Sequence, residues 1–159
     1  MLRHVGALTR LLGRRHLSTQ HTLRSEVVVE GIGLHTGGPV KLVMSPSPPN
    51  SGVTFQTTST GTGFGAVHQN VQSTLLCTTL GTELSRLHTV EHLMAAFYGV
   101  GLDNVQATVQ GQELPVLDGS AAHFIHLLDQ HGRQEQGVPR CTLRVARRVE
   151  VHGPGGSWA

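Results

Sequence analysis

The chain has 159 residues, of which 38% are hydrophobic and 14% are charged. This length allows one ordinary hydrophobic core but leaves no room for two full domains. No apolar run approaches the roughly 20 residues that a membrane-spanning helix needs, so we expect a soluble protein without a transmembrane segment. The two cysteines, Cys77 and Cys141, lack C-x-x-C spacing and are too few for a disulfide framework. The composition therefore excludes a disulfide-stapled secreted domain.

The positive charge of the chain is concentrated at its N-terminus. Five arginines precede the first acidic residue, Glu26, and leucines recur at helical spacing among them. A basic, acid-free leader that contains serine and threonine is typical of an organelle transit peptide. We predict a transit peptide over residues 1–24 and a mitochondrial location, with the plastid as alternative. A disordered basic tail or a nucleic-acid arm would share this charge, but no basic helix follows, so we expect no nucleic-acid partner.

The first half of the remaining chain alternates short apolar runs with turn-rich segments. Residues 27–29 and 40–44 predict strands on either side of a glycine-rich turn at 31–38. A proline-rich connector leads to a further short strand at 53–56, and a loose stretch from 57 to 65 follows. These features indicate a hairpin followed by another strand.

The second half combines two amphipathic helices with an alternating strand at 105–109. The first helix is expected to start after Thr89 as its N-cap and to stop at Gly99, and the second to run from the cap Ser120 to Gly132. The inward stripes of the two helices are Val90, Leu93, Met94 and Phe97, and Ala121, Phe124, Ile125 and Leu128. The later apolar residues Leu143, Val145, Val149 and Val151 indicate a strand pair or one long strand.

This order of elements predicts an α+β fold, with an antiparallel-leaning sheet covered on one face by two helices. We place the domain at residues 25–140 and interpret 141–159 as the start of an incomplete second domain. Residues 149–159 have the pattern of a strand and a turn whose returning strand is missing. We therefore expect a truncated product.

The strongest candidate for chemistry is the adjacent pair Glu91 and His92 at the start of the first helix. Because the apolar stripe faces the core, the two polar side chains are turned elsewhere. The helix dipole at this end opposes protonation, which keeps an imidazole able to bind a metal and a carboxylate able to act as a base. The pair can therefore hold a metal ion and move a proton.

The chain resembles the zinc-dependent UDP-3-O-acyl-N-acetylglucosamine deacetylases of lipid A biosynthesis over most of its length. The resemblance rests on five sequence words in the order of the family, at 31–37, 76–80, 89–93, 102–104 and 113–121. It implies a fold of two similar domains, each a sheet with two helices, around one active site. This chain then corresponds to the first domain and the opening of the second.

The resemblance implies that His92 is a zinc ligand and that Glu91 is the general base that deprotonates zinc-bound water. His35, Leu75 and Cys77 would border the substrate, a UDP-linked acylated glucosamine. The other zinc ligands of the family lie in its second domain, so the chain alone is expected to bind zinc weakly and to act as half an enzyme.

Two other interpretations remain open. The run from His88 to His92 also matches H-x-x-E-H, the signature of inverted zinc peptidases, if His88 lies inside the helix. Alternatively, the chain is an inactive single domain that binds a ligand or pairs with a full-length copy. The segment 113–115, by contrast, is interpreted only as a structural bend.

Overall fold

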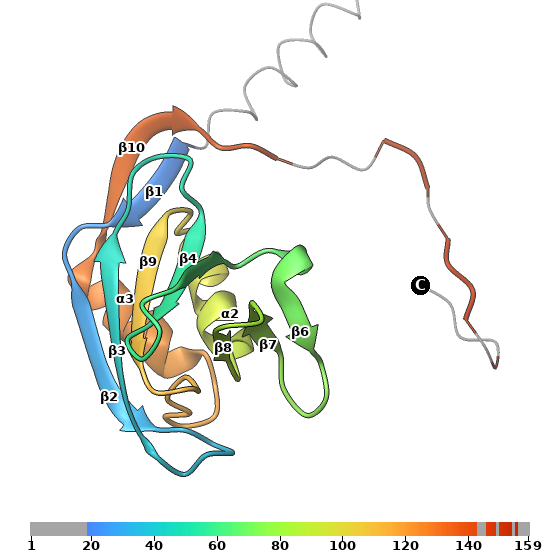
Figure 1. Cartoon of the computed structure of the whole chain (residues 1–159). Helices are drawn as coiled ribbons and strands as arrows, with labels where there is room; N and C mark the ends of the chain where they lie inside the picture. The colour runs from blue at the N-terminus through green and yellow to red at the C-terminus, as the bar shows by residue number, and fades with distance from the viewer. Residues whose placement is uncertain (1–18, 143–145, 149, 154, 156–159) are drawn as a thin grey trace, which may run out of the picture.

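The computed structural model describes residues 19–142, 146–148, 150–153 and 155 (Figure 1). In chain order the elements are β1 (Thr19–Leu23), β2 (Val27–Ile32), β3 (Pro39–Pro46), β4 (Val53–Thr57), β5 (Gly63–Gly65), the 3-10 helix η1 (His68–Asn70), β6 (Val71–Ser73), β7 (Thr79–Gly81), β8 (Arg86–Leu87), α2 (Glu91–Val100), β9 (Val105–Gln110), α3 (Ala122–His131) and β10 (Arg133–Pro139).

The core is built on a five-stranded sheet in the order β2-β3-β9-β4-β5. β2 and β3 form the predicted antiparallel hairpin, and β3 continues antiparallel onto β9. β4 lies parallel to β9, with Val53 opposite Val105. Along β9 the side chains alternate, so that Val105, Ala107 and Val109 are buried as their period-2 pattern requires. The predicted α+β class is confirmed.

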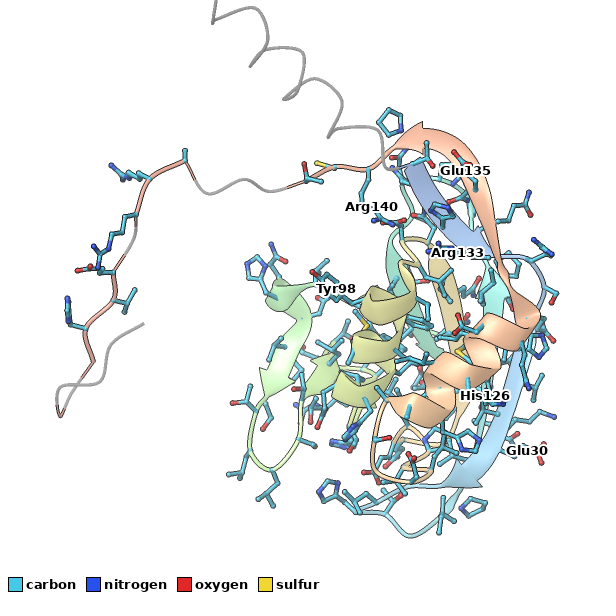
Figure 2. All side chains as sticks on the ribbon, turned by 180° about the vertical axis from the view of Figure 1, so that it is seen from behind. Glu30, Tyr98, His126, Arg133, Glu135 and Arg140 are labelled. Atoms are coloured by element: carbon cyan, nitrogen blue, oxygen red, sulfur yellow. The ribbon has the colours of Figure 1, made fainter. Side chains whose placement is uncertain are left out.

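α2 and α3 lie side by side on one face of this sheet (Figures 1 and 2). The predicted stripe of α2 faces the core: Val90, Leu93 and Phe97 are buried, and Met94 is partly buried against them. α3 contributes Phe124 and Leu128 to the same core. Burial of apolar surface at roughly 25 cal/mol per Å² makes this layer the main source of stability.

Both predicted helix starts are displaced in the structure. Thr89 is not the N-cap of α2: it has a φ of 58°, Val90 is the N-cap, and the Thr89 hydroxyl is bonded to Glu113 instead. Ser120 precedes the N-cap of α3 by one residue, although its Oγ still accepts the N–H of Ala122. Both hydroxyls remain near the helix starts, so each predicted N-cap lies one residue before the observed one.

The predicted stop of α2 at Gly99 is also wrong, whereas the predicted end of α3 at Gly132 is confirmed. Gly99 lies within α2, and the helix ends at Gly101 with a φ of 72°. A glycine adopts this left-handed conformation without the steric penalty of a Cβ atom. Gly99 and Gly101 both lie near the end of the helical pattern, and the helix is capped by the later of the two.

Two smaller sheets were not predicted, β1-β10 and β6-β7-β8. β1 starts at Thr19, inside the segment predicted as a transit peptide, and pairs antiparallel with β10. Because Gln20, Thr22 and Leu23 are buried, the folded domain begins before the boundary predicted at residue 25. The polar run of β1 lacks apolar alternation, so pairing with β10 rather than local pattern makes it a strand. A leader over residues 1–18 lies outside the described residues and stays a prediction.

The predicted final strand is left open for a similar reason. Leu143, Val145 and Val149 lie outside the described residues. Val151 is described, is exposed and belongs to no strand. Within the described part of the chain, no helix has the length and apolar character to cross a membrane.

Candidate active site

The start of α2 carries the two residues singled out from the sequence. Glu91 is the first residue of the helix, and its Oε2 accepts the backbone N–H of Thr78 at 3.1 Å. His92 follows it, and both side chains are partly exposed. Among the described residues, the ring of His92 has no hydrogen-bond partner. Glu91 is thus held by the loop before β7, while the imidazole of His92 is open to a ligand.

The glycine-rich turn between β2 and β3 brings His35 to the same region. The Nδ1 of His35 lies 2.7 Å from Oε1 of Glu113 and 3.4 Å from Oγ1 of Thr89. Thr89 precedes α2 directly, so the turn and the helix start are neighbours through these side chains. A carboxylate can only accept, so Nδ1 carries the proton and Nε2 is left for other contacts.

Glu113 is the buried centre of this arrangement, with no exposed surface. Burial alone would raise the pKa of its carboxyl group. The hydrogen bonds donated by Thr89, Thr36 and His35 outweigh burial and lower the pKa from 4.5 to about 2. Glu113 is therefore ionised throughout the neutral range and acts as an acceptor. Its interpretation as a mere bend was incomplete.

Cys77 and Leu75 lie on the loop that joins β6 to β7. Cys77 is partly buried, its Sγ lies 3.8 Å from Oγ1 of Thr79, and it precedes the residue that binds Glu91. The structure therefore brings Cys77 close to the helix start. Leu75 is 80% exposed on the same loop, so it is free to contact a ligand but is not brought against Glu91 or His92 by any described hydrogen bond.

The structure does not support the inverted peptidase motif. That motif requires His88 and His92 on one face of a helix, but α2 begins only at Glu91. His88 instead lies in extended backbone, bridged to Glu113, and its Nδ1 is 2.9 Å from Oγ1 of Thr79. The five-residue match is therefore a coincidence of spacing.

The donor set fits part of a metal site. His92 supplies an imidazole with no internal partner, and Glu91 stands beside it, as one ligand and a base require. Within the described residues, however, no group of three or more histidine, cysteine, aspartate or glutamate side chains is arranged to hold a metal ion. A catalytic zinc ion usually takes about three protein ligands. These residues fit a contribution to such a site and not a whole one.

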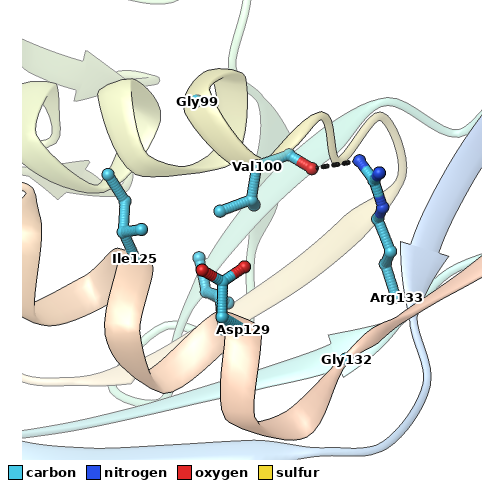
Figure 3. A pocket seen from close by; sticks show the side chains of 7 residues that line it. Gly99, Val100, Ile125, Asp129, Gly132 and Arg133 are labelled. Carbon is cyan, nitrogen blue, oxygen red and sulfur yellow. Dashed lines mark hydrogen bonds between the residues drawn. The ribbon is translucent and has the colours of Figure 1, made fainter.

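A cleft of about 470 Å³ lies at the opposite end of α2 (Figure 3). It is lined by Gly99, Val100, Ile125, Leu128, Asp129, Gly132 and Arg133. Arg133 donates from Nη1 to the carbonyl oxygen of Val100 at 2.6 Å and so joins the C-terminal ends of the two helices. Glu91 is roughly 12 Å away along the helix axis, at 1.5 Å per residue. This cleft is separate from the candidate active site.

Sequence reasoning missed Glu113 and the second role of Thr89. Glu113 is followed by leucine and proline and shows no helical or strand periodicity. It is buried by contacts with His35 and Thr36, which lie far from it in the sequence. The sequence signal that was available is that residues 35–36 and Glu113 both lie in segments that carry the family resemblance. The resemblance therefore draws attention to these residues, but it does not predict that they contact one another.

Comparison with known proteins places the chain. Residues 20–159 match the family model described as UDP-3-O-acyl N-acetylglycosamine deacetylase. The chain is 41% identical over 143 residues to the UDP-3-O-acyl-N-acetylglucosamine deacetylase of Haemophilus influenzae, covering 88% of this chain and 47% of that protein. For the protein of the same name from Methylococcus capsulatus the identity is 40% over 142 residues, covering 88% and 46%.

The protein of the same name from Helicobacter pylori (strain ATCC 700392 / 26695) is 36% identical over 132 residues, covering 83% of this chain and 45% of that protein. The chain thus spans about half the length of the curated relatives it matches. The match begins at Gln20, within β1, in agreement with a folded domain that starts upstream of residue 25. The chain belongs to the UDP-3-O-acyl N-acetylglycosamine deacetylase family.

Proposed function

We propose that this chain supplies one half of a zinc-dependent hydrolytic site that removes the N-acetyl group from UDP-3-O-acyl-N-acetylglucosamine in lipid A biosynthesis. The observation that carries the proposal is the pairing of Glu91 and His92 at the start of α2, with Glu91 fixed by the N–H of Thr78. The names of the relatives support the reaction and the substrate class.

The proposal gives each residue a distinct role. A bound zinc ion would supply Lewis-acid polarisation of the amide carbonyl and of the attacking water. His92 would hold the metal through a ring nitrogen, and Glu91 would accept the proton of that water. The Thr78 N–H fixes one carboxylate oxygen of Glu91 and leaves the other for that proton. His35, Leu75 and Cys77 are proposed to border the substrate.

A chimeric enzyme tests the reaction. Residues 20–159 replace the matching segment of the Haemophilus influenzae relative, and acetate release is measured on the acylated UDP-sugar. We expect turnover, loss of most turnover with retained zinc in Glu91→Ala, and loss of both in His92→Ala. His126→Ala is the matched control, because His126 is exposed on α3 (Figure 2). Full activity of the Glu91 variant would exclude it as the base.

Zinc measured on the chain alone tests the half-site. We expect the purified chain to lose zinc during mild chelation, because the described residues hold no complete ligand set. Selective change of the His92 ring signals in a zinc titration would support its role as a ligand. One zinc per chain that survives chelation and the His92→Ala change would overturn the assignment. A folded chimera that keeps zinc but releases no acetate would favour an inactive ligand-binding domain.

We also propose that the protein acts in mitochondria, with the plastid as the alternative. The support is compositional: five arginines precede the first acidic residue, and four of them lie within residues 1–18. A fluorescent fusion carrying residues 1–18 tests this directly, with an Arg→Gln version of the same segment as control. Diffuse fluorescence from both fusions would contradict organelle targeting.

A further inference from the structure

The carboxylate of Glu113 joins two segments that the candidate active site needs. One is the turn that carries His35, between β2 and β3, and the other is Thr89 at the entry to α2. Oε2 accepts the backbone N–H of Thr36 at 2.9 Å and that of His35 at 3.0 Å. Oε1 accepts the Thr89 hydroxyl at 2.7 Å and lies 2.7 Å from the His35 ring. The Thr36 hydroxyl also donates to Oε2, at 2.9 Å.

The backbone around Glu113 is wedged between the same two segments. On one side, the N–H of His88 donates to the carbonyl of Gln112 at 3.0 Å, and Leu114 donates back to His88 at 3.1 Å. On the other side, the N–H of Val116 donates to Ile32 at 2.9 Å. The strip 112–116 therefore connects the turn to the approach of α2 through main chain and side chain together.

Gly33 makes room for the carboxylate. A Cβ atom at this position would meet both the Thr36 hydroxyl and Oε2 of Glu113, at 2.2 and 2.5 Å, distances that real Cβ contacts do not reach. The neighbouring Gly38 has open space around its Cβ position and no positive φ, although it belongs to the same turn. The glycine at position 33 is thus required by the close approach of the bonded pair Thr36 and Glu113 and not by a left-handed backbone.

The backbone of Thr89 explains why a bond to Glu113 is needed at the start of α2. Its φ of 58° is unusual for a β-branched residue, which pays a steric penalty in the left-handed region. Such a conformation persists only when surrounding contacts fix it. The bond from its hydroxyl to Glu113 is one of those contacts, and Glu91 and His92 follow immediately.

We infer that Glu113 is a positioning residue of the deacetylase half-site, fixing the His35 turn and the Thr89 entry to α2 relative to one another. The inference rests on the proposed function. A buried carboxylate is a costly way to hold two segments together unless all its acceptor sites are used, and here several donors use them. The carboxylate holds the His35 ring through Nδ1, which leaves Nε2 free, and the His35 side chain is 39% exposed.

The test uses the full chain and measures backbone amide exchange residue by residue. Glu113→Gln keeps the shape but replaces one accepting oxygen with an NH₂ group, which faces N–H and O–H donors. We expect the amides of His35, Thr36, Val90 and Met94 to exchange roughly 10- to 100-fold faster. Amides in the centre of the sheet, at Leu42 and Val109, should keep wild-type protection.

Two further variants separate positioning from a simple loss of stability. Gly33→Ala keeps every hydrogen-bonding group but pushes on the Thr36 hydroxyl and on the carboxylate to which it is bonded, so it should reproduce the exchange pattern of Glu113→Gln. Gly38→Ala, in the same turn, should not. A zinc titration followed by the His92 ring signals is the second readout, and both disruptive variants should weaken the response at least severalfold while leaving the sheet protected.

The outcomes are distinguishable from those of the proposed function. Wild-type exchange at both segments in Glu113→Gln, or equal loss of protection at Leu42 and Val109, would overturn the positioning role. Local opening at only one of the two segments would also overturn it, since the role requires both. Absence of any zinc response in the unmodified chain would count against the proposed metal site, while the exchange pattern would still decide the role of Glu113.

Discussion

Two regions of the molecule are held together by different forces: the layer of two helices on the five-stranded sheet, and the corner formed by His35, Thr36, Thr89 and Glu113. In the layer, apolar side chains such as Phe55, Phe97 and Phe124 are buried without directional bonds. In the corner, a single carboxylate is bonded by side chains and amides from segments far apart in the sequence. The layer therefore contributes stability in proportion to the apolar area it buries. The corner instead fixes the relative position of its segments through the charge of Glu113 and the hydrogen bonds donated to it.

The largest expected effect lies in the layer. Phe97→Ala should destabilise the protein by about 3–5 kcal/mol, because it removes a buried ring from the interface of α2 and the sheet. Tyr98→Ala, at the next position, should change stability by less than ~0.5 kcal/mol, since Tyr98 is 90% exposed (Figure 2). Urea unfolding measures both variants. Similar losses would mean that α2 does not pack through the face described.

The corner should reveal itself by its pH dependence. The folded pKa of Glu113 is about 2, below its ordinary value of 4.5. A lowered pKa stabilises the fold above about pH 4.5, and that contribution is lost as the pH falls from there toward 2. We expect roughly 2–3 kcal/mol to disappear over this window in the wild type.

The comparison with Glu113→Gln isolates this contribution from those of other carboxylates. The difference in unfolding free energy between wild type and Glu113→Gln should be large at pH 7 and should shrink below pH 4.5. Glu30→Gln is the matched control, because Glu30 is exposed and forms a surface ion pair with Lys41 at 3.4 Å. A difference that is independent of pH would show that the carboxylate is not selectively stabilised in its charged form.

An intermediate effect is expected where β1 and β10 are tied to the rest of the molecule. Asp103 accepts the N–H of His21 at 2.8 Å and two donors of Arg140, at 2.6 and 2.7 Å. Asp103→Asn leaves one of these donors facing an NH₂ group, so we expect a loss of about 1–2 kcal/mol. Thermal unfolding at neutral pH checks it, and an unchanged midpoint would mean that water replaces the lost acceptor.

The sequence predicted the layer well and the corner poorly, for a physical reason. The stripe of α2 and the alternation of β9 follow from periods of 3.6 and 2 residues, which local sequence displays. The position of Glu91 and His92 at the start of a helix follows from the same stripe. Neither Glu113 nor the polar strand β1 has a period, because each gains its environment only when distant segments meet.

The helix boundaries were predicted less well than the layer but better than the corner. Thr89 was expected to cap α2 because threonine is a common N-cap residue. Its hydroxyl has a competing acceptor in Glu113, and a bond to an ionised carboxylate is stronger than one to a neutral group. A local rule thus failed where a long-range charge was available, and it failed beside the candidate active site.

The smallest expected effect concerns the backbone at Thr89. The prediction is which of two variants, Thr89→Ala or Thr89→Gly, is the more stable. Thr89→Ala and Thr89→Gly both lose the hydroxyl bonded to Glu113, so both should be less stable than wild type. Glycine normally destabilises relative to alanine, because the unfolded chain gains freedom. Here the φ of 58° reverses that order, since alanine keeps the steric penalty of the left-handed region.

We therefore expect Thr89→Gly to be more stable than Thr89→Ala by roughly 1 kcal/mol or less. Urea unfolding of the two variants side by side measures this difference, with Thr82→Ala and Thr82→Gly as a pair at a position outside the left-handed region. If alanine is the more stable residue at both positions, Thr89 does not hold a left-handed backbone in solution. The Glu113 bond would then fix a side chain and not the conformation from which α2 begins.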